Sequence, residues 1–253
     1  MELRRRPLLF LPVAMGGCAA PPKKGVTGPP APPATNVERL ERIVTRAGLT
    51  WLARVSARDL WRRAPDFAQN IIGDRRATAL AKRTGVDVRR VSEALLFARG
   101  EETTWIVRHQ VPPLFIERAF RRRLTDDVSR TTRPGQIVLI RGRIGEEPRA
   151  LALLGDVACF PTGGSLSRGS AVIANLYAVG KLKTIPTADT AAELRSPTAQ
   201  APFQLWLPGP FSHARQAVLR GAEAVSLSVD LREDDLRLDV EVRGRYPPAA
   251  ERS

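Results

Sequence analysis

The sequence predicts an α+β domain in which a mostly antiparallel sheet is covered by helices. Residues 222–246 alternate apolar and polar side chains on both sides of a short acidic turn, which is the pattern of a half-buried β-hairpin. Upstream, segments of two-residue period are mixed with segments of helical period, as in sheets covered by helices. The chain of 253 residues, 43% of them hydrophobic, is long enough to bury a core.

The first half of the body predicts a helix, a strand, two helices and a hairpin. The initial helix spans residues 36–48, with Asn36 as its N-cap and Gly48 as its stop, because apolar residues recur on one face. A later helix is closed by Gly85. The segments that follow the initial helix are a strand at 49–57, helices at 58–64 and 74–87, and a hairpin of 93–100 with 103–110.

The second half continues with a helix at 112–124, whose inward side chains we expect to be Leu114, Ile116, Ala119 and Phe120. The remaining predicted elements are strands at 135–144, 149–155, 156–163 and 203–209, helices at 169–182 and 210–221, and the closing hairpin. The order strand, helix, strand, strand thus occurs near both ends of the body. It predicts two weakly similar β-α-β-β units.

The closing hairpin pairs residues 225–231 with 235–243 around Asp234. Its alternation places one set of apolar side chains on a single face of both strands. We expect this face, including Leu227 and Leu238, to point into the core. The expected set is Val225, Leu227, Val229, Leu231, Leu236, Leu238, Val240 and Val242.

A separate segment precedes the body. Three arginines at positions 4–6 are followed by the apolar run 7–15, which is typical of an export signal and too short to cross a bilayer. The stretch after Cys18 is rich in Pro and Gly and predicts an extended tether. The predicted organisation is a signal peptide at 1–17, a tether at 18–35, one α+β domain at 36–246 and a disordered tail at 247–253.

Gly16, Gly17 and Cys18 resemble the lipobox of bacterial lipoproteins, although Met15 stands where leucine is usual. The resemblance implies that Cys18 is lipidated and that the signal is cut just before it. The chain would then be held in membrane lipid by a covalent acyl anchor.

Ala19, in place of aspartate, follows the cysteine and in these proteins favours the outer membrane, here facing the periplasm. Residues 5–9 also resemble a twin-arginine signal, so the export route stays open. Residues 1–246 loosely resemble uncharacterised predicted lipoproteins of myxobacteria-like Gram-negative bacteria. That resemblance implies an envelope location and no known activity.

The net charge of +14 predicts either a solvated basic surface or an anion-binding face. The basic residues are dispersed, and the densest cluster is Arg121–Arg123, on the wet side of a helix or against anionic lipid or glycan groups. We expect no nucleic-acid partner, because the chain carries an export signal. Candidate partners are an anionic envelope glycan or an envelope protein.

Chemistry-bearing residues are sparse. His109 and His213 each lack a nearby metal ligand, so we expect surface or partly hydrogen-bonded histidines, no metal and no cofactor. Cys159 lies in a predicted apolar strand, which favours a core residue over a nucleophile. The four tryptophans also read as core: Trp51, Trp61, Trp105 and Trp206.

The loop at 161–172 is rich in Gly and Ser and leads into a predicted helix, so it can aim backbone N–H groups at an anion. We favour a plain strand-to-helix connection, capped by Ser167 or Ser170, over an anion site, because the loop lacks the P-loop ending and the hydrolase elbow. Its candidate anion-binding residues are Gly163, Gly164, Ser165 and Arg168.

Two functions follow from these observations. The first is a non-catalytic binding or assembly module anchored in the envelope. The alternative is an envelope hydrolase or transferase that acts on an anionic glycan or lipid through the 161–172 loop.

Overall fold

The computed structural model describes residues 34–162 except 36, 38, 101, 134 and 135, the four residues 172, 175, 176 and 178, and residues 201–244 except 233 and 234. These residues belong to one compact unit, 31–253. Its elements, in chain order, are η1 (Leu40–Ile43), β1 (Trp51–Val55), α1 (Ala57–Arg63), α2 (Pro65–Thr84), η2 (Val88–Arg90), β2 (Val91–Arg99), β3 (Glu102–His109), α3 (Pro113–Arg121), β4 (Asp126–Arg133), β5 (Ile137–Ile144), β6 (Glu147–Leu154), β7 (Val157–Thr162), β8 (Phe203–Pro208), α5 (Ala217–Arg220), β9 (Ala222–Arg232) and β10 (Asp235–Gly244).

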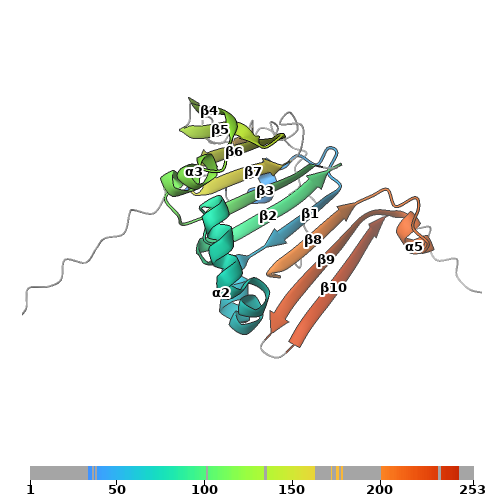
Figure 1. Ribbon diagram of the computed structural model, residues 1–253. Helices are drawn as coiled ribbons and strands as arrows, with labels where there is room; N and C mark the ends of the chain where they lie inside the picture. Colours follow the sequence, from blue (N-terminus) through green and yellow to red (C-terminus); the bar gives the residue numbers. More distant parts are fainter. Residues whose placement is uncertain are drawn as a thin grey trace, which may run out of the picture. The chain divides into compact units, whose positions relative to one another are not determined.

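The described strands form one antiparallel sheet in the order β10-β9-β8-β1-β2-β3-β7-β6-β5-β4 (Figure 1). The predicted α+β class with a mostly antiparallel sheet is therefore confirmed. The closing hairpin also has the predicted pairing, because Leu227 lies opposite Val240 and Val229 lies opposite Leu238. The strand positions follow from alternation, since a shift of one residue would move every apolar side chain to the other face.

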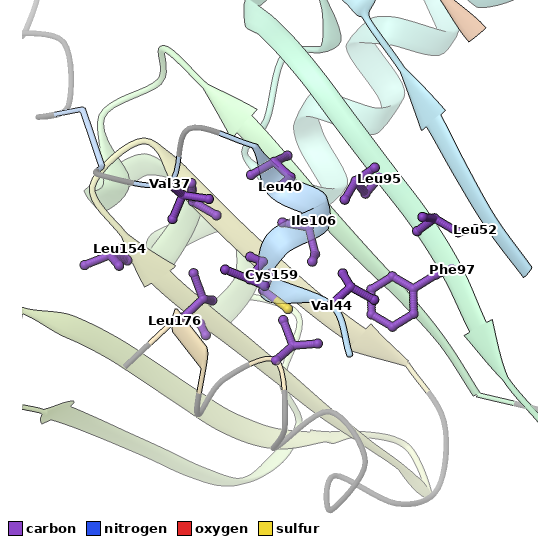
Figure 2. Close-up of a cluster of buried hydrophobic side chains, with 14 of the residues drawn as sticks. Val37, Leu40, Val44, Leu52, Leu95, Phe97, Ile106, Leu154, Cys159 and Leu176 are labelled. Carbon is purple, nitrogen blue, oxygen red and sulfur yellow. The ribbon is translucent and has the colours of Figure 1, made fainter. Parts of the chain in front are cut away.

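One face of the sheet is covered by the segment that runs from Val37 to Leu49 and by the helical residues Val172 and Leu176 (Figure 2). Leu40 and Val44 pack there against Ile106 and Cys159 in a shared hydrophobic cluster. The buried amide of Asn175 donates a hydrogen bond of 2.9 Å to the carbonyl of Ile43. The opposite face carries a second cluster, which includes Ile116 and Phe120 of α3 and, from the sheet, Leu151, Leu153 and Ala158.

Helices α2 and α3 lie over this second face (Figure 1). The helix α2 is interrupted at Gly73, where φ is 56° and ψ is 150°, so the predicted helix at 74–87 corresponds to its second half. It ends at Gly85, which is left-handed with φ 75° as the C-cap rule requires. A Cβ at Gly85 would lie 2.6 Å from the Cα of Ile116. Gly85 therefore sets how closely α2 approaches α3.

Two predicted helices are wrong. The segment predicted as a helix at 36–48 contains only the 3-10 turn η1, and Asn36 lies outside the described residues. Its apolar positions are nevertheless buried, because the segment runs as an irregular cover across the sheet. Of the predicted helix at 210–221, only Ala217–Arg220 is helical. His213 lies in a turn.

Helix α3 forms as expected, and Ile116 and Phe120 are buried. Leu114 was predicted to point inward, but it is 52% exposed. Ala119 is half-buried. The inward stripe contains Glu117 instead, whose carboxylate receives a 2.7 Å hydrogen bond from the guanidinium of Arg130. This ion pair allows a charged residue to occupy the inner side of the helix.

The inward placement of Leu238 is also wrong. Leu236, Leu238 and Val240 are 54–58% exposed, and Leu227 is half-buried. The strand register shows the reason. Leu227 lies beside Leu205, and Leu205 lies beside Ala53, so this apolar face continues the face that α2 and α3 cover elsewhere. The only described helix between β8 and β9 is α5, whose four residues are too few to cover it.

We therefore expect Leu238→Ala to change the free energy of unfolding by no more than about 0.5 kcal/mol, as for most surface substitutions. The matched change Leu95→Ala removes a side chain that is 1% exposed and should cost about 2–5 kcal/mol. Urea denaturation of both variants measures the difference. Equal losses would contradict the exposed position of Leu238.

Candidate ligand-binding site

A cavity of about 450 Å³ lies between the sheet and the helices. Its volume is within the range of small-molecule sites, roughly 300–1,000 Å³. Helix α2 contributes Leu80 to the lining, and the sheet contributes Val107 from its helix-covered face. The complete lining is Val55, Ala57, Leu80, Arg83, Thr84, Val86, Val88, Val91, Ala94, Trp105, Val107, Phe120, Arg123, Ile144, Arg149, Ala150, Phe160 and Pro161.

Aromatic side chains form part of the cavity wall. Trp105 and Phe160 are cross-strand partners on β3 and β7, and both line the cavity. The ring of Phe120 on α3 is tilted against Phe160, with centroids 6.3 Å apart. Trp105 is 43% exposed, so the prediction of a core tryptophan is wrong at this position. Its indole is available to contact a ligand, whereas Trp206 is 3% exposed and lies in the core as predicted.

Three arginines line the same cavity: Arg83 near the end of α2, Arg123 just after α3 and Arg149 in β6. The guanidinium of Arg123 donates a hydrogen bond of 3.3 Å to the backbone carbonyl of Arg83. Burial lowers the pKa of Arg123, and the charges of Arg83 and Arg149 lower it further. Arg149 also pairs with Glu147. The three cations therefore lie close together and repel one another.

A second hollow, of about 550 Å³, lies over α2 and α3. Half of its lining residues are charged, among them Lys82, Arg90 and Arg118, and no sheet residue forms its floor. It is a groove on the helix surface and has one aromatic residue in its described lining, Phe115, whereas the first cavity has three. The cavity between sheet and helices is thus the better candidate for a ligand site.

The residues predicted as sites are not among those that the structure describes. Cys18 and the loop residues Gly163, Gly164, Ser165 and Arg168 all lie outside the described residues. Their proposed roles stay predictions. Phe160, just before that loop, and Pro161, its first residue, are described and line the cavity.

Cys159 is fully buried in the first hydrophobic cluster, as its apolar strand predicts. Burial raises the pKa of its thiol to about 12. The thiolate is the reactive form of cysteine, so this residue is inert at neutral pH. The structure thus places Cys159 as a packing residue.

His109 is 1% exposed, which corrects the expectation of a surface or partly hydrogen-bonded histidine. Neither ring nitrogen forms a hydrogen bond of good geometry within the described part of the chain. Burial lowers the pKa of His109 to about 4, although the backbone of Val111 and the charge of Asp156 act in the opposite direction. Arg90 adds to the lowering. The side chain is therefore neutral at pH 7.

His109 should make the fold sensitive to acid. Between pH 6.5 and 4, the unfolded chain binds a proton at this residue and the folded chain does not. The contribution of neutral His109 to the free energy of unfolding is therefore fully present above pH 6.5 and is lost as pH falls toward 4. The loss should reach about 3 kcal/mol, at 1.36 kcal/mol per pKa unit. Urea unfolding at pH 7.5 and pH 4, in the wild type and in His109→Leu, measures it. The same pH dependence in both proteins would contradict this role.

The described residues show neither a membrane-spanning helix nor a metal-binding cluster. No helix in that part of the chain is long and apolar enough to cross a membrane. The same residues contain no group of three or more His, Cys, Asp or Glu side chains that could hold a metal ion.

Sequence reasoning missed the cavity, because its arginines and aromatics come from distant parts of the chain. The cluster Arg121–Arg123 was the one usable signal, and only Arg123 of the three lines the cavity. Arg122 caps α3 and lines the outer groove. The end of a helix turns neighbouring side chains in different directions, and the sequence alone does not show which of them points inward.

Comparison with known proteins gives the fold and no activity. No protein-family model matches the chain, and no curated protein matches it significantly. Two solved structures are similar, crystal forms IV and III of TP0453, each with a TM-score of 0.50 and 15% sequence identity. The match to form IV covers 80% of this chain and 79% of that one, and the match to form III covers 83% and 82%. At this identity the likeness supports the fold alone: a mostly antiparallel sheet with helices.

Proposed function

We propose that this protein is a non-catalytic binding module of the cell envelope, anchored in the outer membrane through lipidated Cys18 and facing the periplasm. Its ligand is a small molecule with a substantial apolar part. The observation that carries this proposal is the cavity of about 450 Å³ between the sheet and helices α2 and α3.

The lining supports binding rather than catalysis. Most of its side chains are apolar, and burying an apolar ligand there gains about 0.8 kcal/mol per methylene group. The described lining contains no Asp, Glu, His or Cys, the residue types that most often serve as general acids, bases or nucleophiles. In a mostly apolar site, a small number of polar groups serves to orient the ligand.

We also propose that the body consists of two weakly similar β-α-β-β units. Strands β1 and β8, which begin the two units, are antiparallel neighbours, and the order outward is β1-β2-β3 on one side and β8-β9-β10 on the other. In the first unit, α1 and α2 connect the first two strands, whereas in the second unit α5 is a single turn. This difference accounts for a cavity over the first unit and an open apolar face on the second.

N-Phenyl-1-naphthylamine tests the proposed function, because this neutral dye fluoresces more strongly in apolar surroundings. We expect saturable binding to the full chain and its loss in Ala94→Phe, which fills the cavity at a half-buried position. Circular dichroism establishes that the variant is folded.

The exposed face of β10 could also attract the dye, so Leu238→Asp is the matched control. This variant should bind the dye as the wild type does. Binding that survives Ala94→Phe and disappears in Leu238→Asp would contradict the proposed site.

A further inference from the structure

The cavity is chemically asymmetric along the sheet. Its lining strands lie in the order β1, β2, β3, β7, β6 and β5, and at about 4.8 Å per step they span roughly 24 Å. Val55 and Ala94 line the cavity at the β1–β2 side, and Arg149 lines it at the β6 side. The described charged side chains of the lining are the three arginines. One side of the cavity is thus apolar and the other is cationic.

Arg83 and Arg123 contribute most to this cationic side. Neither forms an ion pair with a carboxylate in the described parts of the chain. Arg123 donates one N–H to the carbonyl oxygen of Arg83. Arg149 is paired with Glu147, whose side chain is 68% exposed. A guanidinium presents five N–H donors, so each of these arginines retains donors for an anion. An incoming anion would relieve the repulsion among them.

We infer that the ligand is a single-chain amphiphile with an anionic head group, held by Arg83, Arg123 and Arg149, and that its alkyl chain runs toward Val55 and Ala94. The inference rests on the proposed function, because it names the ligand class of the same cavity. Arginine recognises carboxylates and phosphates through charge-assisted, often bidentate, hydrogen bonds. A free fatty acid and an alkyl phosphate share this chemistry.

Displacement of the bound naphthylamine dye tests the inference. The competitors are dodecanoate, dodecyl phosphate, dodecanol and dodecyltrimethylammonium, which share one alkyl chain, used below their micelle concentrations at pH 8. Both anions should displace the dye at concentrations about ten-fold or more below that of dodecanol, as expected for hydrogen bonds to charged groups. If dodecanoate is the stronger competitor, the natural ligand is a fatty acid, and if dodecyl phosphate is the stronger, the natural ligand is a phosphate ester. The cation should be the weakest competitor.

Arg123→Gln removes the central charge and should reduce the preference for anions by about ten-fold while leaving displacement by dodecanol unchanged. Arg83→Gln, at an exposed position on α2, is the second variant and should act in the same direction. Arg122→Gln is the matched control, because it removes the neighbouring charge, which lines the outer groove and not this cavity. It should retain the preference.

The outcomes separate this inference from the proposed function. Equal displacement by dodecanol and both anions, with dye binding intact, would overturn the anionic head group and leave the apolar site. A preference for anions that persists in both Arg123→Gln and Arg83→Gln would overturn the assignment to these arginines. Absence of dye binding to the wild type would overturn the proposed function itself.

Discussion

Cys18→Ser is expected to abolish fatty-acid labelling of the protein in its native host and to leave an uncleaved precursor. If the protein is a lipoprotein as proposed, the Cys18 thiol becomes thioether-linked to diacylglycerol and the new amino terminus is acylated. Each buried methylene contributes about 0.8 kcal/mol, and two or more chains make dissociation negligible. Wild-type protein should therefore stay on membranes through a high-salt wash.

Cys159→Ser is the control, because this buried side chain belongs to the folded core, and the variant should label normally. A basic body with net charge +14 could bind anionic membranes without any anchor, but that attraction is screened by salt. If the wild type carries no acyl label or is removed by the wash, surface charge replaces lipidation as the explanation for membrane association.

Gly85→Ala should destabilise the fold by about 3 kcal/mol, combining the cost of a left-handed non-glycine residue with overpacking. The added Cβ would meet three atoms of α3: the Ile116 Cα at 2.6 Å, the Phe115 carbonyl oxygen at 2.8 Å and the Ala119 Cβ at 2.9 Å. Two of these are backbone atoms, so no side-chain rotation relieves the contact. Because Leu80 and Thr84 of α2 line the cavity, dye binding should weaken as well.

Gly145→Ala isolates the conformational part of this cost. Gly145 also has a positive φ, 61°, but a Cβ there meets nothing within 4 Å. The Gly145→Ala change should lower the free energy of unfolding by about 1–2 kcal/mol, and dye binding should be unchanged. Chemical denaturation compares the two variants, and a Gly85→Ala loss no greater than that of Gly145→Ala would show that α2 and α3 are not in close contact at this point.

The strands could be predicted because each is a local pattern with a strong burial constraint. In β9 and β10, alternation alone predicted both the pairing and the shared apolar face. It did not predict exposure, because whether a face is covered depends on another element, here the single-turn α5. Similarly, Leu40 and Val44 have the spacing of a helix face and are buried, but an irregular segment buries them equally well.

The candidate site could hardly be predicted from the sequence. Arg83, Arg123 and Arg149 look like ordinary surface cations in a chain with 40 basic residues, and only the packing of α2 and α3 on the sheet brings them together. Trp105 lies in an apolar strand pattern that usually indicates a core residue. Trp105 lines the cavity between the sheet and the helices, and its indole is left partly exposed. A cavity is a property of imperfect packing between elements and has no local signature.

Photo-crosslinking tests the central claim most directly. A dodecanol analogue with a diazirine on its terminal carbon is irradiated with the full chain, and the adducts are located by proteolysis and mass spectrometry. We predict adducts on cavity residues such as Val55, Ala94 and Val107, and their loss in Ala94→Phe. Adducts confined to Leu236, Leu238 and Val240 on the exposed face of β10 would contradict the claim that the cavity is the binding site.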